Sequence, residues 1–268
     1  MSRQDPQASR QGDGDDPIIA ARRKRLEGVR DRLLAEPRNV DALCQAATIL
    51  QDLGRFDEAV AHLERAADVC RGASPASRCQ VLTQLANCFA AGGNHDRAER
   101  WAHAALAAAP DQAGPYLALA TLALERGATD QAERYYRVAR ELRPEHSEAH
   151  AALAMIRQQA GQYEEAFELY LDSLRCDTDN LVALLGLFQT SCQMGDFSQI
   201  IHYLELYLAG HDGDASVQFC LATLYARQGR LGEARDMTLK VLAAEPLKQD
   251  AVELLVELQD ALAEAGCR

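Results

Sequence analysis

Aromatic residues and runs of β-branched residues are scarce in this sequence. Only 6% of its 268 residues are aromatic, and a single Trp is present. Hydrophobic residues make up 48% of the chain and are rich in Ala and Leu. Because Ala and Leu favour helices, whereas β-branched and aromatic side chains favour strands, this composition predicts an all-α fold.

Long apolar segments are also missing. The first 16 residues are polar and lack the apolar core of a secretion signal. No stretch approaches the roughly 18 apolar residues that a membrane span requires. We therefore expect a cytoplasmic protein that does not insert into membranes. Residues 1–16 hold too few apolar side chains to build a core, so we expect a disordered polar tail there.

Cysteine spacing of the kind that binds zinc is absent. The chain has eight cysteines, and none of them form a C-x-x-C pair. We expect reduced thiols that pack as small hydrophobic side chains. His146 and His150 stand four residues apart, but no Glu follows His146 as in the zinc-binding H-E-x-x-H motif. The sequence therefore predicts neither a metal site nor a cofactor.

Motifs for catalysis and for nucleic-acid binding are missing as well. No Ser or Cys lies in a nucleophile motif, and no Gly-rich phosphate loop or dinucleotide fingerprint is found. The net charge is -12, which argues against a general nucleic-acid role. The one basic run, Arg22 to Arg25, is expected on the solvated face of a helix. We therefore predict a protein that is not an enzyme and does not bind nucleic acid.

The most informative feature that is present is a periodic series of glycines. The last five members of this series are each 34 residues apart. The series comprises Gly54, Gly93, Gly127, Gly161, Gly195 and Gly229. A fixed period of this length is typical of stacked pairs of helices. Each glycine is expected in the tight turn between the two helices of a pair, where the backbone takes a positive φ.

The same period gives the domain organisation. A helix at 17–37 starts at Asp16-Pro17 and ends at Pro37. Six repeats follow, at 40–73, 79–112, 113–146, 147–180, 181–214 and 215–248. Residues 249–265 are expected to form a capping helix over the last repeat. The first two glycines are 39 residues apart, and we assign the five extra residues to an added loop in the turn-rich segment 71–77.

Small residues recur at fixed distances from each glycine, and this pattern resembles the tetratricopeptide repeat. The second helices carry Ala59, Ala98, Ala132, Ala166 and Ala234, and later Ala66, Ala105, Ala139 and Ser173. The first helices carry Ala47, Ala86, Ala120, Ala154 and Ala222. The resemblance covers about 205 residues. It implies a right-handed α–α superhelix, a tetratricopeptide solenoid, of about 14 antiparallel helices.

The fifth repeat departs from this pattern. Its three small positions hold Phe188, Ile200 and Tyr207. Two interpretations stay open at this point. Either the bulky side chains are accommodated by a repacked core, or they change the local curvature and shape a binding pocket next to the fourth or sixth repeat.

The resemblance also implies a binding site, because the first helices of such arrays line a concave groove. The positions expected to face that groove are Thr48, Asn87, Thr121, Met155, Gln189 and Thr223, with Leu185 and Phe219 as an apolar patch. Family members that bind chaperones clamp a carboxylate with Lys and Arg at such positions, and those residues are missing here. Amide side chains such as Asn87 and Gln189 can instead bond the backbone of an extended peptide.

Three functions follow from this interpretation. The first is a non-catalytic scaffold or adaptor that binds a peptide segment of a protein partner in the concave groove. The second is self-assembly into homo-oligomers or a coat, in which the N-terminal helix docks on a neighbouring copy. The third is a regulatory subunit of an enzyme complex.

Overall fold

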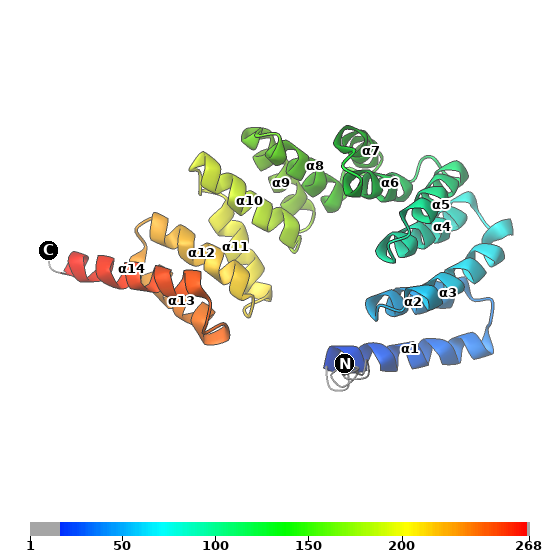
Figure 1. Ribbon diagram of the computed structural model, residues 1–268, viewed down its shortest axis with the longest axis horizontal. Helices are drawn as coiled ribbons and strands as arrows, with labels where there is room; N and C mark the ends of the chain where they lie inside the picture. The colour runs from blue at the N-terminus through cyan, green and yellow to red at the C-terminus, as the bar shows by residue number, and fades with distance from the viewer. Residues whose placement is uncertain (1–16, 267–268) are drawn as a thin grey trace, which may run out of the picture. The chain divides into compact units, whose positions relative to one another are not determined.

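The computed structural model describes residues 17–266. The tail expected at 1–16 lies outside the described residues. Within 17–266 the chain forms fourteen α-helices and one 3-10 helix, and it has no strand. The predicted all-α fold is confirmed, and Figure 1 shows the helices in chain order.

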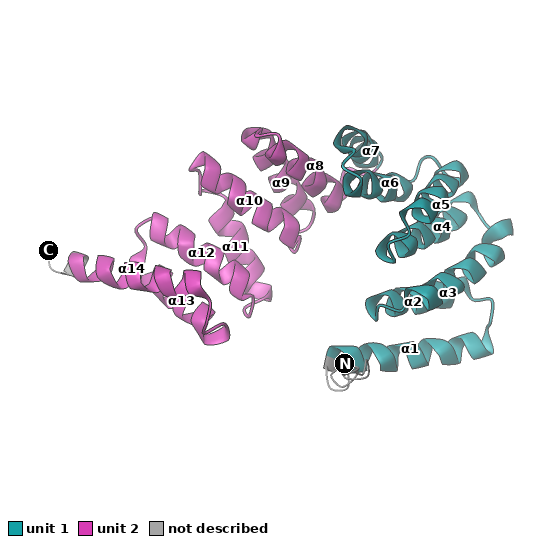
Figure 2. Cartoon of the chain, in the orientation of Figure 1, with its two compact units in different colours: residues 1–142 teal, residues 143–268 magenta. Residues whose placement is uncertain are grey.

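The chain divides into two compact units, residues 1–142 and 143–268 (Figure 2). We call them the N-terminal and the C-terminal unit. The described part of the N-terminal unit holds a first helix and three helix pairs. These are α1 (Pro17–Ala35), α2 (Val40–Asp52), α3 (Phe56–Val69), the 3-10 helix η1 (Cys70–Gly72), α4 (Pro75–Ala91), α5 (His95–Ala108), α6 (Ala113–Glu125) and α7 (Thr129–Leu142).

The C-terminal unit holds the other three helix pairs and a last helix. They are α8 (Ser147–Gln159), α9 (Tyr163–Cys176), α10 (Leu181–Met194), α11 (Ile200–Gly210), α12 (Ala215–Arg227), α13 (Leu231–Ala244) and α14 (Gln249–Gly266). Each unit has a core cluster of its own. Leu43 and Leu50 are fully buried in one, and Leu171 and Leu187 in the other.

The turn inside each helix pair is built on its glycine. All six glycines of the 34-residue series have positive φ, between 69° and 77°. In the fourth pair, Gly161 donates its N–H to Gln158 O at 3.0 Å, and Gln162 donates to Arg157 O at 2.9 Å. These bonds satisfy carbonyls that the end of the first helix would otherwise leave unpaired. The expected turn geometry is therefore present.

A substitution at one of these glycines tests this geometry. We expect Gly161→Ala to lower the free energy of unfolding by about 1–2 kcal/mol, because a Cβ is strained at this φ. No atom lies within 4 Å of the added Cβ, so steric overlap with neighbours does not contribute. Gly210→Ala is the control, since that position is also open but has no positive φ. Equal urea unfolding curves for the two variants would contradict the argument.

The small residues of the repeat pattern lie where paired helices come together. All fourteen of the Ala and Ser side chains named above for this pattern are at most 1% exposed. Small side chains at these places let the two helices of a pair approach closely. Larger neighbours such as Leu63 and Leu174 fill the remaining space and are themselves at most 1% exposed.

The fifth pair reaches the same burial by different packing. Ile200 and Tyr207 are 0% and 7% exposed and belong to the core cluster of the C-terminal unit, and half-buried Phe188 packs against it. Its second helix, α11, begins five residues after the turn glycine instead of two. Asp196 accepts hydrogen bonds from both the N–H and the hydroxyl of Ser198, which holds the longer turn. The bulky residues therefore belong to a repacked core.

The extra residues between the first two pairs do not form the added loop expected over 71–77. The helix α4 begins at Pro75, so three of these residues are already helical. Ser74 caps the helix by accepting the N–H of Ser77 at 3.1 Å, and Pro75 takes the first helical position, where its missing N–H costs nothing. The insertion thus mainly lengthens α4.

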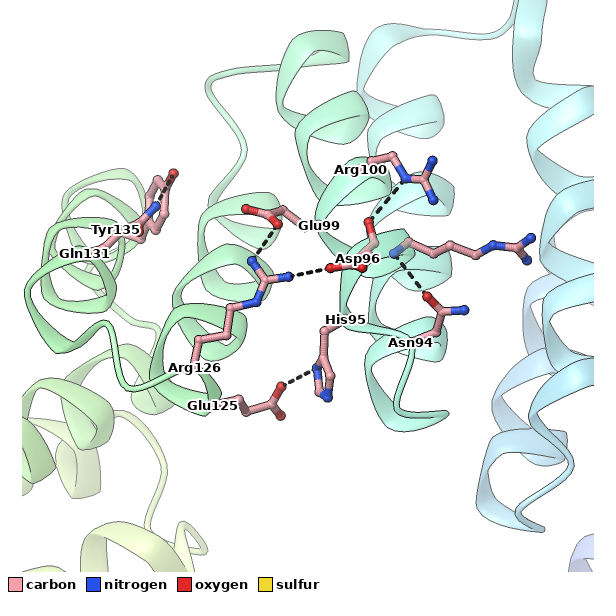
Figure 3. Close-up of polar contacts among 10 residues, drawn as sticks. Asn94, His95, Asp96, Glu99, Arg100, Glu125, Arg126, Gln131 and Tyr135 are labelled. Atoms are coloured by element: carbon pink, nitrogen blue, oxygen red, sulfur yellow. Dashed lines mark hydrogen bonds and ion pairs between the residues drawn. The ribbon is translucent and has the colours of Figure 1, made fainter.

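Ion pairs link the second and third helix pairs of the N-terminal unit (Figure 3). Arg126, at the end of α6, donates to Glu99 Oε2 at 2.6 Å and to Asp96 Oδ1 at 3.2 Å on α5. His95 Nδ1 lies 3.0 Å from Glu125 Oε2. The Glu99 hydrogen bond is the main cause that raises the pKa of Arg126. Because these groups are exposed, we expect them to orient the pairs more than to stabilise them.

The cysteines behave as hydrophobic side chains. None of the seven described cysteines is in a disulfide, and Cys70, Cys79, Cys88 and Cys220 are buried. Burial raises the pKa of Cys88 to about 11. A thiol with so high a pKa stays protonated at neutral pH and is a poor nucleophile.

Candidate functional site

The eight residues expected to face a groove all lie on the first helices of the six pairs, and solvent reaches each of them. Thr48, Asn87, Thr121 and Gln189 are exposed, while Met155, Leu185, Phe219 and Thr223 are half-buried. Three of them meet at one place. Met155 on α8 and Leu185 and Gln189 on α10 line the same cleft in the C-terminal unit.

This α8–α10 cleft has a volume of about 610 Å³, within the range of about 300–1,000 Å³ typical of ligand pockets. Its other lining residues are Gln158, Gln159, Tyr163, Tyr170, Val182, Gly186 and Gln193. Four glutamines and two tyrosines thus supply its polar groups, and no Lys, Arg, Asp, Glu or His lines it. Such a surface suits uncharged chain segments with apolar side chains.

A relay of hydrogen bonds fixes the glutamine amides. The hydroxyl of Tyr170 on α9 donates to Gln158 Oε1 at 2.6 Å, and Gln158 Nε2 donates to Gln189 Oε1 at 3.0 Å. The Tyr170 side chain is 1% exposed, and burial raises its pKa to about 12, so the hydroxyl keeps its proton. With Oε1 of Gln189 already used as an acceptor, its Nε2 remains as a donor at the exposed end of the relay.

Glycine at position 186 makes room for this relay. A Cβ added to Gly186 would lie well under 3.0 Å from Cζ and Cε1 of Tyr170, a separation that real contacts do not show. The Tyr170 ring therefore reaches the backbone of α10 only because residue 186 has no side chain. Neither residue was assigned to the site from the sequence. A glycine inside an apolar helix costs about 1 kcal/mol of helix stability relative to Ala, so its presence there is a signal of close packing.

The threonines and Asn87 make fewer contacts. Thr48, Thr121 and Thr223 each donate to the carbonyl four residues earlier in their own helix. The hydroxyls of Thr48 and Thr223 can therefore accept a hydrogen bond from a ligand, but their own protons are used. The Thr121 hydroxyl also contacts the hydroxyl of Tyr136 at 3.2 Å. Asn87 makes no side-chain hydrogen bond within residues 17–266, so its amide is open to solvent.

Phe219 does not join the cleft. The structure places it against the small cluster of Ala215, Val241 and Ala251, and Lys248 Nζ lies 5.5 Å from the centre of its ring. The apolar patch expected from Leu185 and Phe219 is therefore split, with Leu185 in the α8–α10 cleft and Phe219 beside a cation.

A second cleft, of about 410 Å³, lies in the N-terminal unit. It is lined by Glu64, Phe89, Arg97, Arg100, Trp101 and Ala104. The guanidinium of Arg97 lies 5.4 Å from the centre of the Phe89 ring, and Trp101 is half-buried. This cleft is charged and, apart from Phe89 on α4, lies on the second helices α3 and α5, and it contains none of the predicted groove residues.

The two histidines with metal-like spacing are used locally. His150 Nε2 lies 2.8 Å from Pro144 O, and His146 Nδ1 lies 3.4 Å from Glu148 Oε2. No group of three or more metal-binding side chains occurs among the described residues. In the same part of the chain, no helix combines the length and apolar content needed to cross a bilayer.

Comparison with known families identifies the repeat. Family models described as "Tetratricopeptide repeat" match residues 40–111, 89–156 and 215–238, which together make up more than half of the chain. This chain belongs to the tetratricopeptide repeat family. The unmatched stretch 157–214 of this tetratricopeptide repeat protein contains the repacked fifth pair. Among curated proteins, none matches the sequence significantly.

Solved structures show the same fold. A chain of the APC/C hetero-tetramer Cut9-Hcn1 has a TM-score of 0.64 at 16% identity, over 90% of this protein and 47% of that chain. This tetratricopeptide repeat protein thus spans about half its length. Pseudomonas aeruginosa pilF has a TM-score of 0.58 at 19% identity, over 70% of this protein and 86% of its own chain.

A tetratricopeptide repeat protein from Parabacteroides merdae gives a TM-score of 0.53 at 20% identity, over 84% of this protein and 87% of that chain. At such identities the likeness concerns the fold alone. Tetratricopeptide repeat proteins are generally non-catalytic scaffolds for protein–protein interaction, and this protein shares that architecture.

Proposed function

We propose that this protein is an adaptor that binds an extended peptide segment of a protein partner along its first helices, with the α8–α10 cleft as the main anchoring site. The relay from Tyr170 to Gln189 carries the proposal. It presents an oriented N–H donor beside an apolar floor formed by Met155 and Leu185. A peptide offers the matching pair of groups, a backbone carbonyl and an apolar side chain.

The energetics favour this use of the cleft. Because the Gln158 and Gln189 amides are already fixed, a ligand that accepts from Gln189 Nε2 does not have to order them. The absence of charged lining residues means that an uncharged segment enters without leaving a charge unpaired. Thr223, on α12 of the same unit, would contribute a weaker polar contact.

The unpaired thiols fit a reducing compartment, because disulfides persist in oxidising ones. We accordingly propose a cytoplasmic adaptor. The amide and apolar side chains that line the cleft would select the partner by its peptide sequence.

The test uses peptides selected on the folded protein from a random displayed library. We expect the selected peptides to have an uncharged segment with an apolar side chain. Gln189→Ala should weaken their binding about fivefold, since one hydrogen bond contributes about 1 kcal/mol. Tyr170→Phe should weaken it less, because the donor remains but its orientation is lost. Fluorescence anisotropy with labelled peptides measures both effects.

Gln80→Ala is the matched control. Gln80 is an exposed glutamine on α4, outside both clefts, so its removal should leave the affinity unchanged. If the folded protein selects no peptide, or if Gln189→Ala binds as tightly as the wild type, the proposal is wrong.

A further inference from the structure

The first and last described helices each pack on one side only. The main contacts of α1 are with α2, and those of α14 are with α13 and α12. Figure 1 shows them as the blue and the red helix. Within the described part of its own unit, no helix besides α2 packs extensively on α1, and none besides α12 and α13 packs extensively on α14. We call the side turned away from these contacts the outer face. The two helices carry opposite charge.

The outer face of α14 is acidic and partly apolar. Val252 and Val256, four residues apart, are 38% and 53% exposed. Beside them run five acidic residues spaced by three or four, which places them in one stripe on a helix. They are Asp250, Glu253, Glu257, Asp260 and Glu264, and all of them are exposed. The helix has no Lys or Arg, and its acids form no ion pair within the described chain.

The first helix, α1, is basic. It carries Arg22, Arg23, Lys24, Arg25, Arg30 and Arg32 against two acidic residues, Glu27 and Asp31. Arg22 and Arg30 pair with acids of the neighbouring helices, at 3.7 Å and 3.8 Å.

Arg23, Lys24 and Arg25 are exposed and form no ion pair in the part of the chain that the structure describes. Apolar side chains flank this run at both ends of α1. Ile18 is 60% exposed and Leu34 is 82% exposed. The helix therefore offers unpaired positive charge together with apolar contacts.

We propose that α1 of one copy docks on the outer face of α14 of a second copy. Opposite charges meet in this arrangement, whereas contact between two α14 helices or two α1 helices would bring like charges together. The exposed valines of α14 then gain an apolar partner in Ile18 or Leu34. Neither α1 nor α14 contributes a residue to the lining of the α8–α10 cleft, so the proposed contact leaves that lining unchanged.

The contact joins different surfaces of the two copies, so each copy keeps one free end. Such a heterologous contact builds a ring when its rotation closes and an open chain of copies when it does not. Exposed ion pairs contribute little free energy each, and salt screens them, with a Debye length of about 10 Å at 0.1 M. We therefore expect weak association that grows with protein concentration and disappears at high salt.

Sedimentation velocity on the full chain tests the proposal. In low salt the mean mass should rise with concentration, and in high salt it should be that of one chain. Glu253→Lys/Glu257→Lys and Arg23→Glu/Lys24→Glu should each reduce self-association at least tenfold. An equimolar mixture of the two variants should associate again, because the Glu253→Lys/Glu257→Lys variant keeps its basic α1 and the Arg23→Glu/Lys24→Glu variant keeps its acidic α14.

The matched control reverses the charge of two acidic residues on another helix that have the same spacing. Glu164 and Glu168 on α9 are exposed and four residues apart, and Glu164→Lys/Glu168→Lys should associate like the wild type. Circular dichroism confirms that each variant remains folded. A wild-type mass of one chain at all concentrations in low salt would overturn the proposal, and so would variants that still self-associate or a mixture that does not.

Discussion

Gly186→Ala is expected to be the most destabilising conservative change in the C-terminal unit. The added Cβ overlaps the far end of the Tyr170 ring, which is 1% exposed. Overpacking of this kind costs about 1–3 kcal/mol, and movement of the ring also breaks the hydrogen bond to Gln158. We expect a net loss of about 3 kcal/mol, measured by urea unfolding.

Two variants make this expectation specific. Gly28→Ala is the matched control, because Gly28 also lies inside a helix but has nothing within 4 Å of the added Cβ. That change should be neutral or stabilising by about 0.5–1 kcal/mol. Tyr170→Leu removes the ring. In that background, Gly186→Ala should lower the free energy of unfolding by less than it does in the wild type. Equal losses for Gly186→Ala and Gly28→Ala would show that the close approach is not the cause.

Asn180→Ala is expected to give the second large effect, because Asn180 serves two structural roles. Its Oδ1 accepts the N–H of Ala183 at 3.0 Å and caps α10. Its Nδ2 donates to Ser147 Oγ at 2.7 Å and to Ser173 Oγ at 3.2 Å. Both serines are buried, and the Ser173 hydroxyl also donates to Ser147 O at 2.9 Å. This network ties the start of α8 to the end of α9.

The expected loss is about 2–3 kcal/mol, of which the cap contributes about 1 and the buried hydrogen bonds the rest. Asn39→Ala provides the comparison. Asn39 caps α2 through Ala42 at 2.9 Å, but its Nδ2 reaches only the exposed Glu36, so its loss should be about 1 kcal/mol. Asn180→Ser keeps an acceptor for the helix cap, so its loss of unfolding free energy should lie between those of Asn180→Ala and Asn39→Ala. Equal unfolding free energies for Asn180→Ala and Asn39→Ala would mean that the buried serines contribute nothing.

The sequence was sufficient for the features that depend on local chemistry. The positive φ of the turn glycines and the burial of the small residues both follow from a repeat pattern with a turn glycine in each of six copies. The late start of α11 was not predicted, because it depends on the Asp196 turn inside one aberrant copy. The length of α4 was also missed, since Ser74-Pro75 resembles a loop and a helix start equally well.

The candidate site was predicted only in part. Met155, Leu185 and Gln189 follow from their places on the first helices, and the structure brings these three together. The relay through Tyr170 and Gln158 joins residues 12 and 31 positions apart. Such pairings depend on how neighbouring repeats stack and on side-chain rotamers, and a repeat pattern contains neither.

The uncharged lining of the α8–α10 cleft distinguishes the proposed peptide site from the proposed contact between α1 and α14, which depends on charge. No Lys, Arg, Asp, Glu or His lines that cleft, so no ion pair there is available for salt to screen. A peptide held by an amide and an apolar floor would stay bound as the ionic strength rises, while contacts between the charged terminal helices fade. The ionic conditions of the cell would therefore govern whether copies associate, without altering what each copy holds.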